Sequence, residues 1–254
     1  MERYFVDERS IVREIWGKAD TVLFIFAASA AEFALNKAVD WLYFTGKLPA
    51  DPLGRLFSTV TYSRQILFSE YTEALTAIDR ISKIHGAVEQ ARGSQIPQWA
   101  YRDVLFMLID HSIRSFEALE RKLTDEEKAE VFSVFYRVGH RMGITGLPTT
   151  YSHWRTMREE HLQQNMIRSH FTVDLYRQYR KHLGWVRYFL LKQVQVIICP
   201  PRVKQLLGLR SVPMMRTLLW LYKAGRQFRF DRPVKLVLLP SAYKAQIAAI
   251  DSSL

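Results

Sequence analysis

The sequence is poor in cysteine, glycine and proline. Of its 254 residues, one is a cysteine (Cys199), 11 are glycine and 9 are proline. A single cysteine excludes an internal disulfide, and no C-x-x-C pair is present for structural zinc or for covalent attachment of haem. Glycine and proline make up roughly 8% of the chain, against about 12% in average proteins. So few turn-forming residues favour long helices over many short strands.

Long hydrophobic runs are also missing. The most apolar run, residues 21–35, is 15 residues long and contains Glu32, whereas a helix that spans a bilayer needs about 20 apolar residues. It is therefore interpreted as a buried core helix. A second apolar stretch, residues 185–201, is interrupted by charged residues and cannot cross a membrane. The N-terminus has no basic segment followed by an apolar stretch, so the expected location is cytoplasmic.

Acidic residues are scarce in the second half of the chain. Residues 1–130 carry a net charge of −4 and residues 131–254 a net charge of +15. Aromatic residues are interleaved with these cations, a pattern that suits an anionic membrane surface, such as peripheral contact with the inner membrane face. A nucleic-acid partner is disfavoured because no reader motif is present. A solvated positive face that complements the acidic first half explains the charge equally well.

Helical periodicity continues through nearly the whole chain. Asp51 precedes Pro52 as a helix cap, Gly93 marks a helix end, and Thr124 with Glu127 forms a capping-box pattern. We therefore expect one all-α domain over residues 1–254. The expected helices are 7–19, 21–44, 51–68, 70–91, 99–122, 124–142, 151–165, one to 183, one to 198, one around Lys204 and one over 214–225. The apolar run 234–239 fits a helix or a strand.

Two histidines lie on apolar helix stripes. His85 follows Ile78 and Ile81 at helical spacing, and His111 lies in a similar stripe farther on. Each is either a core histidine or a ligand. Arg55 and Thr59 are four residues apart, so they share one face of the helix that begins at Asp51. The nucleotide-binding, zinc-protease and hydrolase motifs are all missing from the sequence.

Several blocks together resemble one family. They are ADPLGRLFSTV (50–60), ISKIHGAV (81–88), LIDHSIRSFEALERKLTDEEKAEVFSVFYRVGHRMGI (108–144) and LPTTYSHWRTM (147–157). Their order and spacing resemble the domain family that contains the latex-clearing rubber oxygenases and the MpaB-type oxygenases. The resemblance covers about residues 15–165. The basic part, residues 166–254, matches in general helical character.

The resemblance implies a single helical domain with a globin-like core and a non-covalent haem b. It makes His85 the axial ligand of the haem iron. Arg55 and Thr59 would lie on the opposing helix, close to the haem or to dioxygen. We also expect His111 to be a second pocket residue. The chemistry agrees, since haem iron takes a neutral imidazole from a rigid, apolar helix face.

Two positions depart from the rubber oxygenases. Ser58 stands where those enzymes have a lysine, and Val39, followed by Asp40, stands where they have a glutamate. The resemblance therefore implies a haem b-dependent oxygenase acting on a hydrophobic small molecule with dioxygen, but not specifically on rubber. The alternative is a non-catalytic helical protein that docks on anionic membranes through its basic half. The substrate, the electron source and the oligomeric state stay open.

Overall fold

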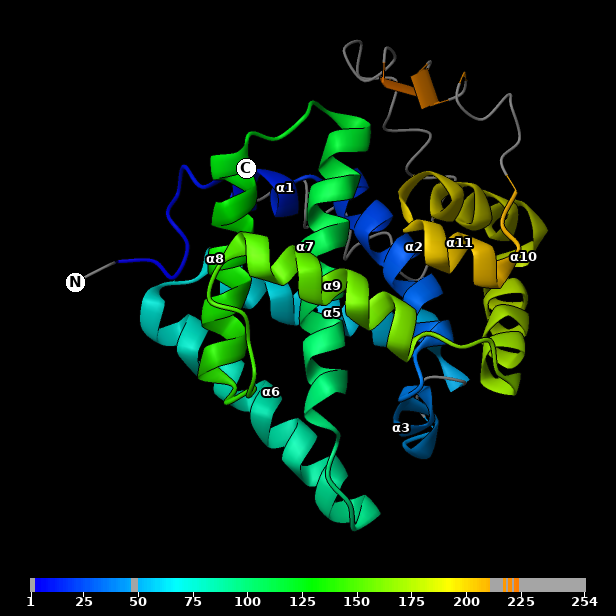
Figure 1. Cartoon of the computed structure of the whole chain (residues 1–254), viewed down its shortest axis with the longest axis horizontal. Coiled ribbons are helices and arrows are strands. Elements are labelled where there is room, and N and C mark those ends of the chain that lie inside the picture. The colour runs from blue at the N-terminus through cyan, green and yellow to red at the C-terminus, as the bar shows by residue number, and fades with distance from the viewer. Residues whose placement is uncertain (1–2, 47–49, 211–216, 218, 221, 224–254) are drawn as a thin grey trace.

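The chain folds as a bundle of helices. The computed structural model describes residues 3–46, 50–210, 217, 219–220 and 222–223, without the side chains of 53 and 55–57. Over these residues the chain forms ten helices, and its β contacts are two isolated bridges, which confirms the all-α fold (Figure 1). The helices are α1 Ile11–Gly17, α2 Ala19–Leu35, α3 Val39–Phe44, α5 Pro52–Phe68, α6 Tyr71–Arg92, α7 Gln98–Leu119, α8 Asp125–Arg141, α9 Tyr151–Asn165, α10 His170–Ile198 and α11 Pro201–Leu207.

Three sequence-based expectations concern parts of the chain outside the described residues. These are the side chain of Arg55, most of the helix expected over 214–225, and the run 234–239. The globin-like character of the core stays a prediction.

Helix α2 lies at the centre of the bundle, between α7 and α10 (Figure 1). Its side chains contribute to three hydrophobic clusters: Val22 and Ile25 face α1 and α7, Ala28 and Ala31 face α10 and α11, and Ala34 faces α10. A helix that is apolar on all sides must be buried, so its interpretation as a core helix is confirmed. Within the described chain, no helix is both long and apolar enough to cross a membrane.

The helix ends follow the capping residues in the sequence. The Asp51 carboxylate accepts a hydrogen bond from the Gly54 backbone N–H at 2.8 Å. Thr124 and Glu127 form both halves of a capping box at the start of α8, and α6 ends at Gly93 in the left-handed conformation. Each cap satisfies backbone groups that have no partner within the helix. The boundaries predicted for α5, α6 and α8 are confirmed to within two residues.

The expected continuous helix over 21–44 is wrong, because the chain breaks at Asn36. The Asn36 side-chain carbonyl accepts a hydrogen bond from the Ala38 backbone N–H at 2.8 Å, and its amide donates to Asp103 at 2.8 Å. Asparagine side chains compete with the helix for backbone partners in this way. Helix α2 therefore ends at Leu35 and a separate α3 begins at Val39. The first expected helix also begins later than Asp7, at Ile11, with Ser10 as its cap.

Helix α10 folds back on itself at Gly184. This residue has φ 71° and ψ 175°, a combination that only glycine adopts without strain. The Tyr176 hydroxyl in the first half donates a hydrogen bond to Gln195 in the second half at 2.9 Å, and the rings of Tyr176 and Tyr188 lie 6.4 Å apart. The two halves therefore meet at a corner, as the separate helices expected to 183 and to 198 indicated.

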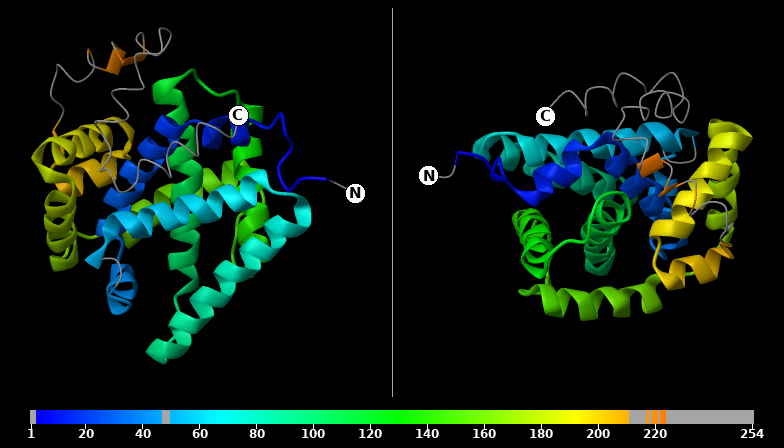
Figure 2. Two further views of the ribbon diagram at one scale, coloured as in Figure 1. Left: turned by 180° about the vertical axis from the view of Figure 1, so that it is seen from behind. Right: turned by 90° about the horizontal axis from the view of Figure 1, so that it is seen from above.

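The end of α6 and the start of α7, with the turn that joins them, project from the rest of the bundle (Figures 1 and 2). The expected apolar stripe of α6 is fully buried at Ile78 but only partly buried at His85. The expectation that His85 is nearly buried is therefore wrong. Its position on α6 lies beyond the part of the helix that packs into the core.

Candidate functional site

His85 faces the first turns of α7. Its imidazole packs edge-on against the Tyr101 ring, with the ring centroids 5.2 Å apart. The Tyr101 hydroxyl donates a hydrogen bond to Glu89, one turn farther along α6, at 3.0 Å. Burial and this contact with Glu89 raise the pKa of Tyr101 above its usual range, so the phenol stays protonated. Tyr101 thus fixes one side of the His85 ring.

The end of α6 is fastened to α3. Arg92 donates a hydrogen bond to the Asp40 carboxylate at 2.6 Å, and its guanidinium carbon lies 3.9 Å from the centre of the Trp41 ring. Asp40 is the acid next to the position where the rubber oxygenases have a glutamate, and here it is an ion-pair partner. These contacts hold α3 against the end of α6 that follows His85.

Arg55 and Thr59 both lie on α5, which packs against α6. They are four residues apart on one helix, so the shared face of their side chains stays a prediction. The Thr59 side chain is partly buried. The structure thus places Thr59 and His85 on neighbouring helices, and the backbone of Arg55 one turn before Thr59.

The described residues contain no cluster of three or more His, Cys, Asp or Glu side chains that could hold a metal ion. The single cysteine, Cys199, is fully buried beside α2, with its sulfur 3.9 Å from the Ala28 carbonyl oxygen. Burial raises the pKa of the Cys199 thiol well above its usual range, so it is not a reactive thiolate. The role of the partly exposed His85 of α6 as a ligand stays a prediction.

His111 lies in the interior and not beside His85. Its side chain is fully buried, and its Nε2 lies 2.6 Å from the Glu32 carboxylate of α2. It follows Tyr101, the α7 residue that contacts His85, by ten positions, which corresponds to about 15 Å along a helix. The structure therefore brings His85 and Tyr101 together and places His111 in a separate buried cluster.

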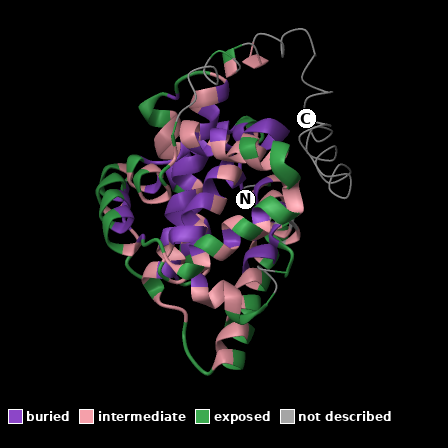
Figure 3. Cartoon of the chain, turned by 90° about the vertical axis from the view of Figure 1, so that its right-hand side faces the viewer, coloured by how far each residue is buried: buried purple, intermediate pink, exposed green. Residues whose placement is uncertain are grey.

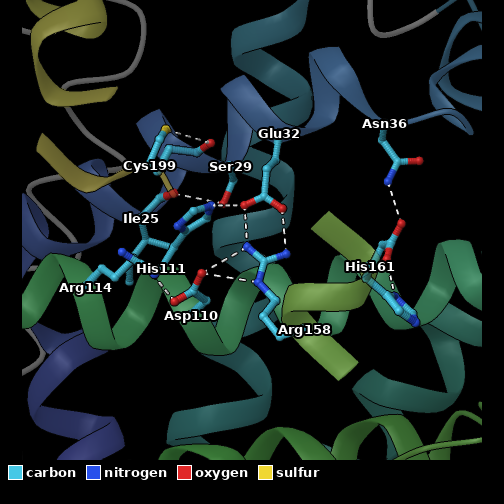
Figure 4. Close-up of polar contacts among 12 residues, drawn as sticks. Ile25, Ser29, Glu32, Asn36, Asp110, His111, Arg114, Arg158, His161 and Cys199 are labelled. Carbon is cyan, nitrogen blue, oxygen red and sulfur yellow. Dashed lines mark hydrogen bonds and ion pairs between the residues drawn. The ribbon is translucent and has the colours of Figure 1, made fainter. Parts of the chain in front are cut away.

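This buried cluster joins α2, α7 and α9 through charged side chains (Figure 4). Arg158 of α9 donates two hydrogen bonds to Glu32, at 2.7 and 2.6 Å, and two to Asp110, at 3.2 and 3.1 Å. Arg114 donates to the other oxygen of Asp110 at 2.6 Å. The side chains of Arg158 and Glu32 are only 5% and 2% exposed. These five residues, Glu32, Asp110, His111, Arg114 and Arg158, are called the ionic cluster below.

The ionic cluster keeps its acids ionised. Burial alone would raise the pKa of Glu32, but the charges of Arg158 and His111 outweigh it and lower that pKa to about 2. Burial likewise opposes ionisation of Asp110, and the guanidinium groups of Arg158 and Arg114 lower its pKa. Glu32 and Asp110 in turn raise the pKa of Arg158 above its usual value. The ionic cluster therefore contains oppositely charged groups in the protein interior.

A second buried group surrounds Asp103 of α7. Its carboxylate accepts hydrogen bonds from Asn36 at 2.8 Å and from Asn165 at 3.1 and 3.0 Å. His161 contacts the same carboxylate through Nδ1. The backbone N–H of Lys37 also donates to the Asn165 carbonyl at 2.9 Å. Asp103 therefore ties the ends of α2 and α9 to the middle of the bundle.

Sequence reasoning identified His111 as a candidate residue but did not identify the other charged residues of the two buried groups. Arg158, Asp110, Asp103 and His161 were all missed. Charged residues within apolar helices were the available signal: Asp110 follows FMLI, and Glu32 interrupts the most apolar run. Such residues need a buried partner of opposite charge, but the sequence does not say which one.

Comparison with known families identifies one match. A family model described as "ER-bound oxygenase mpaB/B'/Rubber oxygenase, catalytic domain" matches residues 15–230. The match reaches well beyond residue 165, into the basic part of the chain. No curated protein matches the chain.

The ionic cluster predicts a large effect of replacing Arg158. We expect Arg158→Met to lower the free energy of unfolding by about 3–5 kcal/mol, because it leaves two buried carboxylates without their shared cation. The matched control is Arg141→Met, since Arg141 donates two hydrogen bonds to Asp79 at an exposed site. It should change stability little. Urea denaturation measures both, and equal losses would contradict the assigned role of Arg158.

The lowered pKa of Glu32 predicts acid sensitivity. Its folded-state pKa is about 2, against an ordinary value of 4.5, so ionised Glu32 stabilises the fold above about pH 4.5. This stabilisation is lost as the pH falls from about 4.5 towards 2. Glu32→Gln should therefore show a shallower decrease of unfolding free energy over this range than the wild type. Glu160→Gln, an exposed glutamate of α9, should follow the wild type; parallel curves for all three proteins would refute the assignment.

Proposed function

The chain belongs to the family of ER-bound MpaB/B'-type oxygenase and rubber oxygenase catalytic domains, and from this membership we propose that it is a haem b-dependent oxygenase. It acts on a hydrophobic small molecule with dioxygen. The observation that carries the proposal is His85, a partly exposed imidazole on a helix inside the matched region. The family membership supports an oxygenase, and the features around His85 support the haem.

The residues around His85 fit a haem better than a metal ion held by side chains alone. A haem needs one axial imidazole from the protein, because its macrocycle supplies the other nitrogen ligands. Beside His85, Ile84 is 45% exposed. A Cβ placed on Gly86 would have no heavy atom within 4 Å. The space beside Gly86 leaves room for a flat macrocycle next to this turn of α6.

We assign His85 as the axial ligand and Tyr101 as the residue that orients its ring. Haem, when bound, supplies the iron that activates dioxygen. Thr59 offers a hydroxyl donor from α5, and Arg55, one turn earlier on that helix, offers a cation for an oxygen species or a haem propionate.

His111 as a haem-pocket residue stays a prediction. Its contact with Glu32 supports a positioning role instead. The ionic cluster and Asp103 fix α7 in the core, and the first turns of that helix present Tyr101 to His85. His111 therefore acts on the proposed site through the placement of α7.

Haem binding is tested by the visible spectrum of the purified full chain after addition of hemin. We expect a Soret band in the wild type and in His153→Ala, which removes an exposed histidine of α9. His85→Ala should lose the band, because it removes the iron ligand while leaving the core intact. Addition of imidazole to His85→Gly should restore it. A wild type that stays colourless, or a band that persists in His85→Ala, would reject the assignment.

The role of Thr59 is tested with azide, which needs no knowledge of the substrate. In the haem-loaded ferric protein, Thr59→Val should weaken azide binding roughly tenfold, the value of one lost hydrogen bond of about 1.4 kcal/mol. Thr59→Ser keeps the hydroxyl and should bind azide normally. Thr61→Val changes an exposed threonine of the same helix and is the matched control. An unchanged affinity in Thr59→Val would show that its hydroxyl does not face the ligand side.

A further inference from the structure

The corner of α10 exposes large apolar side chains at one edge of the molecule. Trp185 is 77% exposed, and Val186 and Phe189 are 43% and 42% exposed. Trp185 follows Gly184 directly, where α10 folds back. Positions 185, 186 and 189 share one face of the second half of the helix. Trp185, Val186 and Phe189 are called the apolar corner below. Figure 3 views the molecule from this side and shows exposed residues along the helices that face the viewer.

An apolar group of this kind is unusual on the surface of a monomeric protein. Elsewhere on the described chain, large exposed apolar residues occur singly, such as Ile84 on α6 and Ile167 before α10. Three within five residues, next to a helix corner, form a local patch. A tryptophan this exposed contributes nothing to the core, so the patch requires another explanation.

Two exposed cations lie just before the apolar corner in the sequence. Arg180 and Lys181 are exposed in the turn that precedes Gly184, and Lys181 is four residues before Trp185. Along α10 the single acid is Asp174. The Tyr43 hydroxyl donates a hydrogen bond to Asp174 at 2.8 Å, and Arg177 forms an ion pair with it at 3.7 Å. The corner therefore combines a positive field with an exposed aromatic face.

We propose that the apolar corner of α10 docks the protein on an anionic lipid surface. Trp185 and Phe189 enter the boundary between headgroups and acyl chains, and Arg180 and Lys181 contact the lipid phosphates. The charge decides between a membrane and a protein partner: exposed cations directly precede the exposed aromatic rings along α10, a combination found in helices that lie in the membrane interface. This docking surface is on a different helix from His85 and does not depend on haem.

The first experiment is co-sedimentation of the full chain with vesicles of phosphatidylcholine, with and without phosphatidylglycerol. We expect binding to the anionic vesicles at low salt and release at high salt. Trp185→Ser/Phe189→Ser should weaken binding at least about tenfold. The matched control, Ile167→Ser/Val173→Ser, removes two apolar residues that are 49% and 48% exposed at other places and should bind like the wild type.

Charge reversal tests the second part of the proposal. Arg180→Glu/Lys181→Glu should abolish binding to the anionic vesicles. Arg80→Glu/Lys83→Glu changes the net charge equally at two exposed cations of α6 and should retain it. Equal losses in the two variants would mean that net charge alone attracts the protein, which overturns the proposed surface.

Insertion is tested with brominated phosphatidylcholine in the anionic vesicles. It should quench part of the tryptophan fluorescence of the wild type but not of Trp185→Phe, although that variant still binds. Absence of vesicle binding at low salt, tighter binding to duplex DNA than to vesicles, or self-association that Trp185→Ser/Phe189→Ser abolishes would each overturn the proposal. The Soret band of the same preparations reports haem separately, so a failure of docking is distinct from a failure of the proposed function.

Discussion

The buried contact of Arg158 with Glu32 and Asp110 is the interaction on which the arrangement of the core depends. It joins three helices that are distant in the sequence, α2, α7 and α9. Removing three charges from water has a large desolvation cost, which only close and well-directed hydrogen bonds offset. The contact therefore permits little sliding of one helix against another. Hydrophobic packing around α2 supplies most of the stability, whereas the ionic cluster fixes the relative positions of the helices.

That fixed core has a consequence for the proposed haem site. Helix α7 is held in the interior at Asp103, Asp110 and His111, and its first turns extend from the core to place Tyr101 against His85. The candidate ligand lies where α6 has left the hydrophobic core and its imidazole is only partly buried. Haem bound to His85 would cover this surface. Helices α6 and α7 therefore contribute both to the rigid core and to the partly exposed proposed site.

Local signals in the sequence predicted much of the fold. The caps at Asp51 and Thr124 and the left-handed glycine at Gly93 act over a few residues, so their patterns were sufficient to place helix ends. The break at Asn36 combines a local hydrogen bond from Ala38 with one to Asp103, 67 residues away, and the distant partner could not be recognised in the sequence. The partners of Glu32 were missed for the same reason: a lone carboxylate in an apolar helix indicates that a cation is near, but only the fold identifies it as Arg158. The four sequence blocks that resemble the oxygenases were sufficient to identify the family. Neither spacing nor composition could show that His111 faces Glu32 and not the partly exposed side of His85.

The basic charge and the proposed chemistry lie on different parts of one domain. Helices α5 and α6 carry the proposed haem residues, and α10 carries the exposed aromatic and cationic side chains. An enzyme that takes a hydrophobic substrate from a lipid surface would use both.

The central claim is tested most directly by a crystal structure of the full chain loaded with hemin. The account predicts a haem whose iron is bonded to the imidazole of His85, on the partly exposed side of α6. Iron bonded to any other residue, or no haem at this position after loading with excess hemin, would contradict it.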